Sequence, residues 1–224
     1  MRFDSKYLIR WGIPGWTIIF GFGLYFCLTY DFEQNLLNGS IQNSTDLLAI
    51  MFSLIVVSVP VGYLLHQAYF IFDFYDKRKK RKVIDEILNH YKDFEVPYNW
   101  DDLTLNEKYF FIEYEWHTSL LKMEDEQRNY IAGRYRYLLT TKHSLGVLRF
   151  SLGTVIFIIF AYQLLYLQFQ HIWGCIIYLV LLLLFFVFSW FNFKYYSKNL
   201  NTIQGKFMQY IKKREQEKIL KEIK

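Results

Sequence analysis

Four long apolar stretches constrain the fold of this chain more than any other feature. They cover residues 13–30, 47–72, 147–167 and 172–193 of the 224-residue chain. A helix of about 20 apolar residues crosses the roughly 30 Å hydrocarbon core of a bilayer, so each stretch has approximately the length of a membrane span. The pattern predicts an all-α fold: a four-helix integral membrane protein with a helical cytoplasmic insert and a C-terminal amphipathic helix.

The positions of the positive charges orient these spans. The 26 Lys and Arg residues lie in the N-terminal segment, in the middle segment up to Arg149, and in the C-terminal tail. The two other connections, 31–46 and 168–171, contain none. Because cytoplasmic connections carry an excess of Lys and Arg, we expect those two connections outside the cell. Both termini and the middle segment are then cytoplasmic.

These expectations divide the chain into five segments. They are an interfacial N-terminal segment (1–12), a transmembrane hairpin (13–72, with spans 13–30 and 47–72), a cytoplasmic helical insert (73–146), a second transmembrane hairpin (147–193, with spans 147–167 and 172–193) and a cytoplasmic charged helix (194–224). Pro14 lies between Gly12 and Gly15 and is expected to separate the interfacial helix from the first span.

The insert carries its own start and stop signals. Six consecutive basic residues, 77–82, follow the second span, as is typical of a stop-transfer signal. Thr104 followed by Glu107 matches a capping box and predicts the start of a helix. We expect that helix to run from Leu105 through Ala132, with Gly133 marking a bend that leads into the third span.

The tail carries a short apolar seam. Leu200, Ile203, Phe207 and Tyr210 recur at a 3-4-3 spacing, which places them on one face of a helix. A seam of this length suits packing against the insert or against a second copy of the chain.

Catalytic signatures are missing from the sequence. It contains no nucleophile elbow, no Walker loop, no Rossmann glycine fingerprint and no His-Glu-x-x-His motif. Glu113 and His117 are spaced to share a helix face, but such pairs are common by chance. We therefore expect no enzyme activity, no catalytic residues, no metal and no cofactor.

Polar residues within the second apolar stretch are more informative, because polar groups are costly in lipid and normally face a partner or water. One interpretation is hydrogen bonding and close packing between helices. The other is a water-filled path, for which the candidate pore-lining residues are Ser53, Ser58, Pro60, His66, Gln67 and Asp73. Four helices from one chain fill their own core, so a pore requires several copies with cyclic symmetry, and we expect a homo-oligomer.

A basic and aromatic strip precedes the third span. The candidate ligand-binding residues are Arg128, Arg134, Tyr135, Arg136, Tyr137 and Lys142. Basic groups bind phosphates, and neighbouring aromatic rings stack on bases, so the strip predicts a nucleotide or short nucleic acid as ligand. Snorkelling of the same side chains to lipid headgroups is the alternative interpretation, with membrane lipid as the partner.

The overall plan resembles the small membrane effectors of prokaryotic anti-phage defence systems. The resemblance is carried by the basic start running into Arg10-Trp11-Gly12-Ile13-Pro14-Gly15-Trp16, followed by two hairpins of spans that flank a cytoplasmic helical insert. It implies an oligomeric ion channel of the bacterial inner membrane. It also implies gating by a nucleotide or short nucleic acid that a partner nucleotidyltransferase makes.

Two other functions fit the same sequence. A non-conducting membrane adaptor would bind a soluble partner through the insert and the tail. A small transporter or lipid-handling protein would have broken spans or inverted repeats, of which Pro60 is the one sign in this chain.

The predicted topology is tested by labelling intact cells with a membrane-impermeant amine reagent. Lys79 and Lys213 should stay unmodified until the membrane is permeabilised, because both lie in segments placed in the cytoplasm. Labelling of either lysine from outside would overturn the topology.

Overall fold

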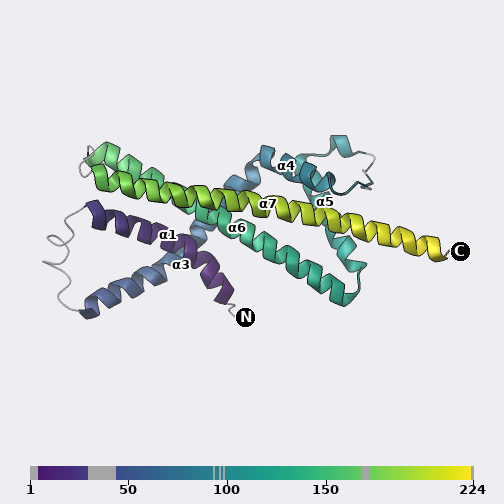
Figure 1. Ribbon diagram of the computed structural model, residues 1–224, viewed down its shortest axis with the longest axis horizontal. Coiled ribbons are helices and arrows are strands. Elements are labelled where there is room, and N and C mark those ends of the chain that lie inside the picture. Colours follow the sequence, from purple (N-terminus) through teal and green to yellow (C-terminus); the bar gives the residue numbers. More distant parts are fainter. Residues whose placement is uncertain are drawn as a thin grey trace. The chain divides into compact units, whose positions relative to one another are not determined.

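The computed structural model describes residues 5–29, 44–92, 94–95, 97, 99–167 and 172–222. These residues form α1 (Ser5–Thr29), α3 (Ser44–Tyr75), α4 (Lys77–Leu88), a 3-10 turn (Trp100–Asp102), α5 (Leu105–Leu121), α6 (Asp125–Tyr162), a π-helical turn (Gln163–Leu167) and α7 (Ile172–Glu222) (Figure 1). The described residues contain no strand, and the all-α class is confirmed.

Three described helices are long and apolar enough to cross a membrane. They are the helices Phe52–Asp73, Asp125–Leu165 and Trp173–Lys221, each of which contains a stretch of that apolarity, and Gly12–Tyr25 is a shorter apolar helix. These segments indicate a membrane-associated protein. The count of four spans stays a prediction, and most of the two expected external connections lies outside the described residues.

The chain packs as two compact units. Unit 1 consists of Met1–Ile71 and Ser144–Asn192, and unit 2 consists of Phe72–His143 and Phe193–Lys224. Both α6 and α7 contribute residues to each unit. Unit 2 therefore contains nearly the same residues as the segments 73–146 and 194–224 that the charge pattern assigns to the cytoplasm.

The core of unit 1 combines apolar packing with two buried hydrogen bonds. Its buried apolar residues are Tyr25, Leu152, Val155, Ile159, Cys175, Tyr178 and Leu182. The Tyr178 hydroxyl donates to the Gly21 carbonyl at 2.6 Å, and Gln163 Nε2 donates to the Tyr25 hydroxyl at 2.7 Å. Polar groups in lipid need such internal partners, so these bonds join α1 to the helices around it.

Small residues let two helices of unit 1 approach closely. A Cβ atom added at Gly15 of α1 would lie 1.7 Å from the Ser58 carbonyl oxygen and 3.0 Å from the Gly62 nitrogen of α3. Small residues at such crossings are typical of helices packed in membranes. Only glycine at position 15 permits this contact.

One expectation for the N-terminal region is wrong. α1 is a single helix from Ser5 through Thr29, with Pro14 inside it, so the expected break between residues 1–12 and the first span is absent from the described part. The proline removes one intrahelical hydrogen bond. The helix nonetheless continues, and Pro14 itself is buried against its surroundings.

Unit 2 has a separate apolar core. Its buried residues are Ile84, Ile87, Tyr91, Ile112, Trp116, Leu120, Ile131, Tyr135, Leu138, Leu200 and Met208. The expected capping box is confirmed at the start of α5, where the Thr104 side chain accepts from the Glu107 N–H and the Glu107 carboxylate accepts from the Thr104 N–H. The Thr104 hydroxyl and then the Thr104 N–H, which both donate to the Glu107 carboxylate, lower the pKa of Glu107 below its ordinary value.

The expected single helix over 105–132 is divided in two. α5 ends at Leu121 and α6 starts at Asp125, where acidic Asp125 and Glu126 in the first turn suit the positive end of the helix dipole. α6 then continues through Gly133 without the expected break. A turn signal of Gly or Pro is missing at 122–124, so the sequence pattern did not show this division.

The tail seam packs within unit 2. Leu200 is buried, and Ile203 and Phe207 pack against the unit 2 core. Tyr210 is exposed, and Ile211 is buried in its place. The seam therefore follows the helix period of 3.6 residues instead of a heptad.

The close approach of α1 and α3 at Gly15 predicts that an alanine substitution at this position lowers the stability of the protein. Gly15→Ala should cost about 1–3 kcal/mol because the methyl group has no space. That cost corresponds to a fall of about 2–4 °C in the unfolding midpoint per kcal/mol for a chain of this size. Thermal unfolding of the full-length protein in detergent measures it. Gly23→Ala is the matched control, because nothing lies within 4 Å of a Cβ atom at that position; equal midpoints for the two variants would contradict the packing described.

Candidate functional site

The candidate pore residues of α3 lie on two opposite faces. Ser58 and His66 are buried within unit 1. The Ser58 hydroxyl donates to the Ile55 carbonyl at 2.6 Å, and the His66 ring contacts Phe70 with ring centres 4.6 Å apart. These two side chains pack inside one copy of the chain, so they are not positioned to line a path between copies.

The second face of α3 carries Ser53, Pro60 and Gln67, all exposed. Their seven-residue spacing places them on one stripe, which we call the polar stripe. Pro60 has no N–H to offer the Val56 carbonyl, and Val56 lies on the same side of the helix. The stripe therefore presents the side-chain amide of Gln67 and the backbone carbonyl of Val56, which lacks the N–H that it would accept from in a regular helix.

Asp73 belongs to unit 2, whereas the other pore candidates belong to unit 1. Its carboxylate is half-buried, and its Oδ1 atom lies 3.2 Å from the Lys79 ammonium. The Asp73 charge is thus matched by a cation of the following helix. Negative charge at a pore mouth stays a prediction for this residue.

Within the candidate ligand set, Tyr135 is part of the unit 2 core. Its ring lies 4.9 Å from the Trp116 ring, and its hydroxyl donates to Glu113 Oε1 at 3.2 Å. Burial, and then the Glu113 charge, raise the pKa of Tyr135 well above its ordinary value. The Tyr135 ring is covered on both sides and is not available to stack on a base.

Arg128 and Lys142 are also engaged with acids of unit 2. Arg128 forms an ion pair with Asp125 one turn earlier. Burial lowers the pKa of Lys142, while the nearby Asp73, Glu86 and Glu113 carboxylates oppose that effect. Both cations have electrostatic partners within the chain, which reduces their attraction for an anionic ligand.

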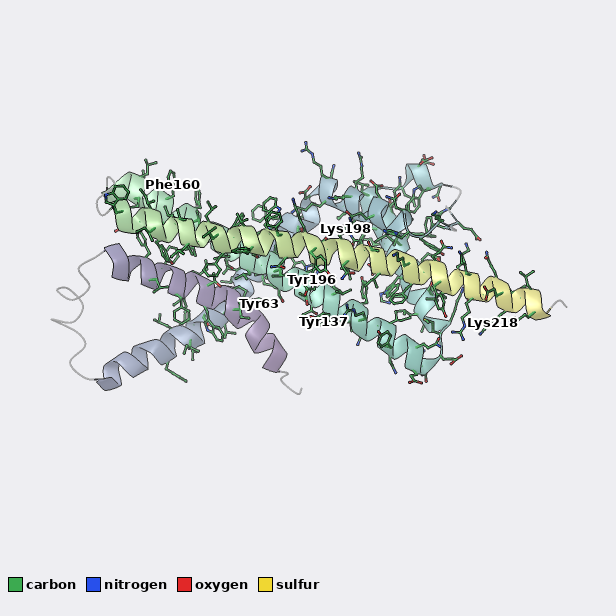
Figure 2. The ribbon with its side chains drawn as sticks, viewed as in Figure 1. Tyr63, Tyr137, Phe160, Tyr196, Lys198 and Lys218 are labelled. Atoms are coloured by element: carbon green, nitrogen blue, oxygen red, sulfur yellow. The ribbon has the colours of Figure 1, made fainter. Side chains whose placement is uncertain are left out.

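Arg134 and Tyr137 share one exposed face of α6. The Arg134 guanidinium lies 5.6 Å from the centre of the Tyr137 ring, within the range of a cation–π contact. Figure 2 shows Tyr137 on α6 and Tyr196 on α7, and the two side chains interact electrostatically. The rings of Tyr195 and Tyr196 are nearly perpendicular, with an interplanar angle of 88° and ring centres 5.4 Å apart. We call Arg134, Tyr137, Tyr195 and Tyr196 the basic–aromatic cluster.

Electrostatic interactions link Arg134, Tyr137 and Tyr196 of this cluster. Interaction with the Tyr137 hydroxyl raises the pKa of Tyr196, and Arg134 acts in the opposite direction. Arg136 is exposed but lies two residues from Arg134, which is about 200° around the helix. The six candidates therefore do not form one site; Arg134 and Tyr137 are the two that the fold brings together with further aromatic side chains.

Sequence reasoning missed Tyr195 and Tyr196 as members of this cluster. They follow the fourth apolar stretch, and their position at its end is typical of an interfacial aromatic belt. The interaction of Tyr196 with Tyr137 joins residues distant along the chain, and no spacing within α7 indicates it. The one feature of the sequence that could have indicated their role is that these two tyrosines directly follow a basic residue, Lys194.

Charged residues of the tail pair with charged residues of the insert. Lys212 lies 2.9 Å from Glu95, Arg214 lies 3.3 Å from Glu124, and Lys122 lies 3.1 Å from Glu215. A shallow pocket between them is lined by Lys122, Met123, Glu124, Ile211, Arg214, Glu215 and Lys218. Its basic and acidic groups offset one another, so this pocket does not favour an anion.

The Glu113 carboxylate contacts several side chains of unit 2. Besides Tyr135, its Oε1 atom accepts from Gln204 Nε2 at 3.4 Å, and its Oε2 atom lies 3.9 Å from His117 Nε2. Within the described residues, no group of three or more His, Cys, Asp or Glu side chains is placed to hold a metal ion.

Comparisons with protein-family models, curated proteins and solved structures find no match to this chain. Its function is therefore inferred from its own residues.

The different surroundings of Tyr135 and Tyr137 predict different effects of the same substitution. Tyr135→Ala should destabilise the protein by about 3–5 kcal/mol, as expected for removing a buried aromatic side chain. Tyr137→Ala should change stability little, because more than half of that side chain is exposed. Thermal unfolding of both variants measures the difference, and a larger loss for Tyr137→Ala would contradict the assignment.

Proposed function

We propose that this chain is a homo-oligomeric membrane ion channel, or membrane-depolarising effector, that an anionic nucleotide or short nucleic acid gates from the cytoplasm. The proposal places four spans in a bacterial inner membrane, with both termini in the cytoplasm. A partner nucleotidyltransferase would supply the ligand in anti-phage defence. The proposal treats α3 as the conducting element and the basic–aromatic cluster as the gate.

The apolar surface of unit 1 supports the membrane placement. Large apolar side chains point outward on each of its long helices, among them Phe52, Val56, Leu64, Phe157, Leu165, Ile177, Leu183, Phe185, Phe188 and Phe191. Soluble proteins rarely expose contiguous apolar patches on this scale. The distribution of Lys and Arg supports the proposed orientation.

The polar stripe of α3 is the observation that carries the proposal. Its neighbours on the exposed surface include Phe52, Val57 and Leu64, which suit lipid. Gln67 in contact with lipid would leave its amide without partners, at a cost that polar groups in membranes normally avoid. Contact between copies, with the stripe facing a shared water-filled path, removes that cost.

The position of the basic–aromatic cluster supports a gating role. Arg134 and Tyr137 lie on α6, Tyr195 and Tyr196 lie on α7, and both helices continue from unit 2 into unit 1. A ligand whose phosphate binds Arg134 and whose base stacks on a tyrosine would favour one arrangement of the two helices. Continuous helices are suitable elements for transmitting such a shift.

Ion flux from liposomes tests the proposal. Full-length protein reconstituted into potassium-loaded vesicles should release potassium when cyclic dinucleotides or short oligonucleotides are added to the outside, for molecules inserted with the cytoplasmic side outward. Gln67→Leu should reduce the flux at least about tenfold, because a polar group that an ion or its water contacts is removed. Thr154→Val, which removes a hydroxyl from another span, is the matched control and should conduct normally.

Two further variants test whether the basic–aromatic cluster is responsible for the response to the ligand. Combining Arg134→Gln with Tyr137→Ala should abolish the response, whereas Arg136→Gln should preserve it because Arg136 lies on another face of α6. Absence of flux with every ligand, together with a monomeric mass in detergent, would overturn the channel. Co-purification of a soluble protein in that case would favour the adaptor.

A further inference from the structure

α4 presents one apolar face and one basic face. Ile84 and Ile87 are buried in the unit 2 core, and Val83 and Leu88 pack against it. Residues 78, 81 and 82 lie on the opposite side of the helix, as its 3.6-residue period requires. The inner face therefore fixes the direction in which the basic face points.

Three of the six consecutive cations are engaged within unit 2. Lys79 lies 3.2 Å from Asp73 and 3.6 Å from Asp76. Lys80 donates a hydrogen bond to Asn106, and Lys82 lies 3.8 Å from Glu86. These contacts match the charges of Lys79 and Lys82 and give the Lys80 ammonium an acceptor within the chain.

The other three cations, Lys77, Arg78 and Arg81, are exposed and form no ion pair with any described residue. One acid, Asp85, lies on the same side of the helix and is also exposed. Two guanidinium groups one turn apart offer paired N–H donors that match the oxygens of phosphate. The face therefore has a net positive charge and the chemistry to bind phosphate groups.

An aromatic pair lies next to this basic face along the chain. Phe72 and Tyr75, at the end of α3, are 65% and 76% exposed. Only Asp76 separates Tyr75 from Lys77, and its carboxylate accepts hydrogen bonds from the N–H groups of Arg78 and Lys79. These bonds lower the pKa of Asp76 and cap α4 at its first turn. Exposed aromatic rings followed directly by cations are typical of the headgroup region of a membrane.

We propose that Lys77, Arg78 and Arg81 bind the phosphate groups of anionic phospholipids in the cytoplasmic leaflet. This inference rests on the membrane placement under the proposed function, but not on conduction or on a nucleotide. The lipid site lies on α4 and is separate from the basic–aromatic cluster of α6 and α7. Phospholipid, instead of a soluble anion, is favoured because Phe72 and Tyr75 supply an adjacent surface for acyl chains and headgroups.

Native mass spectrometry of the full-length protein in detergent tests the site. With equal amounts of phosphatidylglycerol and phosphatidylcholine added, the wild-type chain should retain phosphatidylglycerol preferentially. Combining Lys77→Gln, Arg78→Gln and Arg81→Gln should reduce that preference by at least about tenfold, because three cations that attract the anionic headgroup are removed. Combining Lys206→Gln, Lys213→Gln and Lys221→Gln removes the same charge from the exposed side of α7 and should leave the preference unchanged.

Two outcomes of this comparison of lipids and variants would overturn the lipid site. One is equal retention of the two lipids by the wild-type protein, a measurement that does not depend on the folding of any variant. The other is an equal loss of preference in both triple variants, which would indicate a response to net charge alone. Displacement of phosphatidylglycerol by millimolar inorganic phosphate would also contradict the proposal, because a simple anion site needs no lipid. Selective lipid retention by a protein that shows no ion flux would leave the lipid site standing and reject the channel.

Discussion

Outward-facing apolar side chains on unit 1 are the constraint on which the rest of this molecule depends. Water penalises such a surface in proportion to its area, by roughly 25 cal/mol per Å², and unit 1 exposes large apolar residues on α3, α6 and α7. A bilayer removes that penalty but then requires every polar group to find an internal partner. The bonds of Tyr178 and Gln163 supply two such partners inside the unit, and the close contact at Gly15 packs α1 against α3.

Unit 2 is stabilised by a different combination of interactions. Its core surrounds Trp116 and includes the Glu113 carboxylate, which accepts from Tyr135 and Gln204. Ion pairs between insert and tail lie at the exposed edge, where solvent screens them and each contributes little. Apolar burial of Leu200 and Met208 thus holds the tail helix in place.

Features that depend on residues close together in the sequence could be predicted from it. Which side chains other helices bury could not. The capping box at Thr104 depends on residues within one turn, so its spacing identifies it. The division of the polar residues of α3 into two faces follows from the helix period, but which face is covered depends on Gly15 in a different helix. Pro14 was expected to end a helix on local grounds, and the start of α6 at Asp125 has no Gly or Pro signal. The cluster of Arg134 and Tyr137 with Tyr196 depends on a contact between distant segments, which one sequence does not reveal.

The composition of unit 2 from two separate stretches of chain has a practical consequence. A fragment ending before Phe193 would lack Leu200 and Met208 and would open the core around Trp116. No contiguous excision therefore yields a folded unit 2, and proteolytic removal of the last thirty or so residues would act on the whole unit. Loss of the C-terminus is thus a disabling event for this chain, in the way that loss of a central strand disables a sheet.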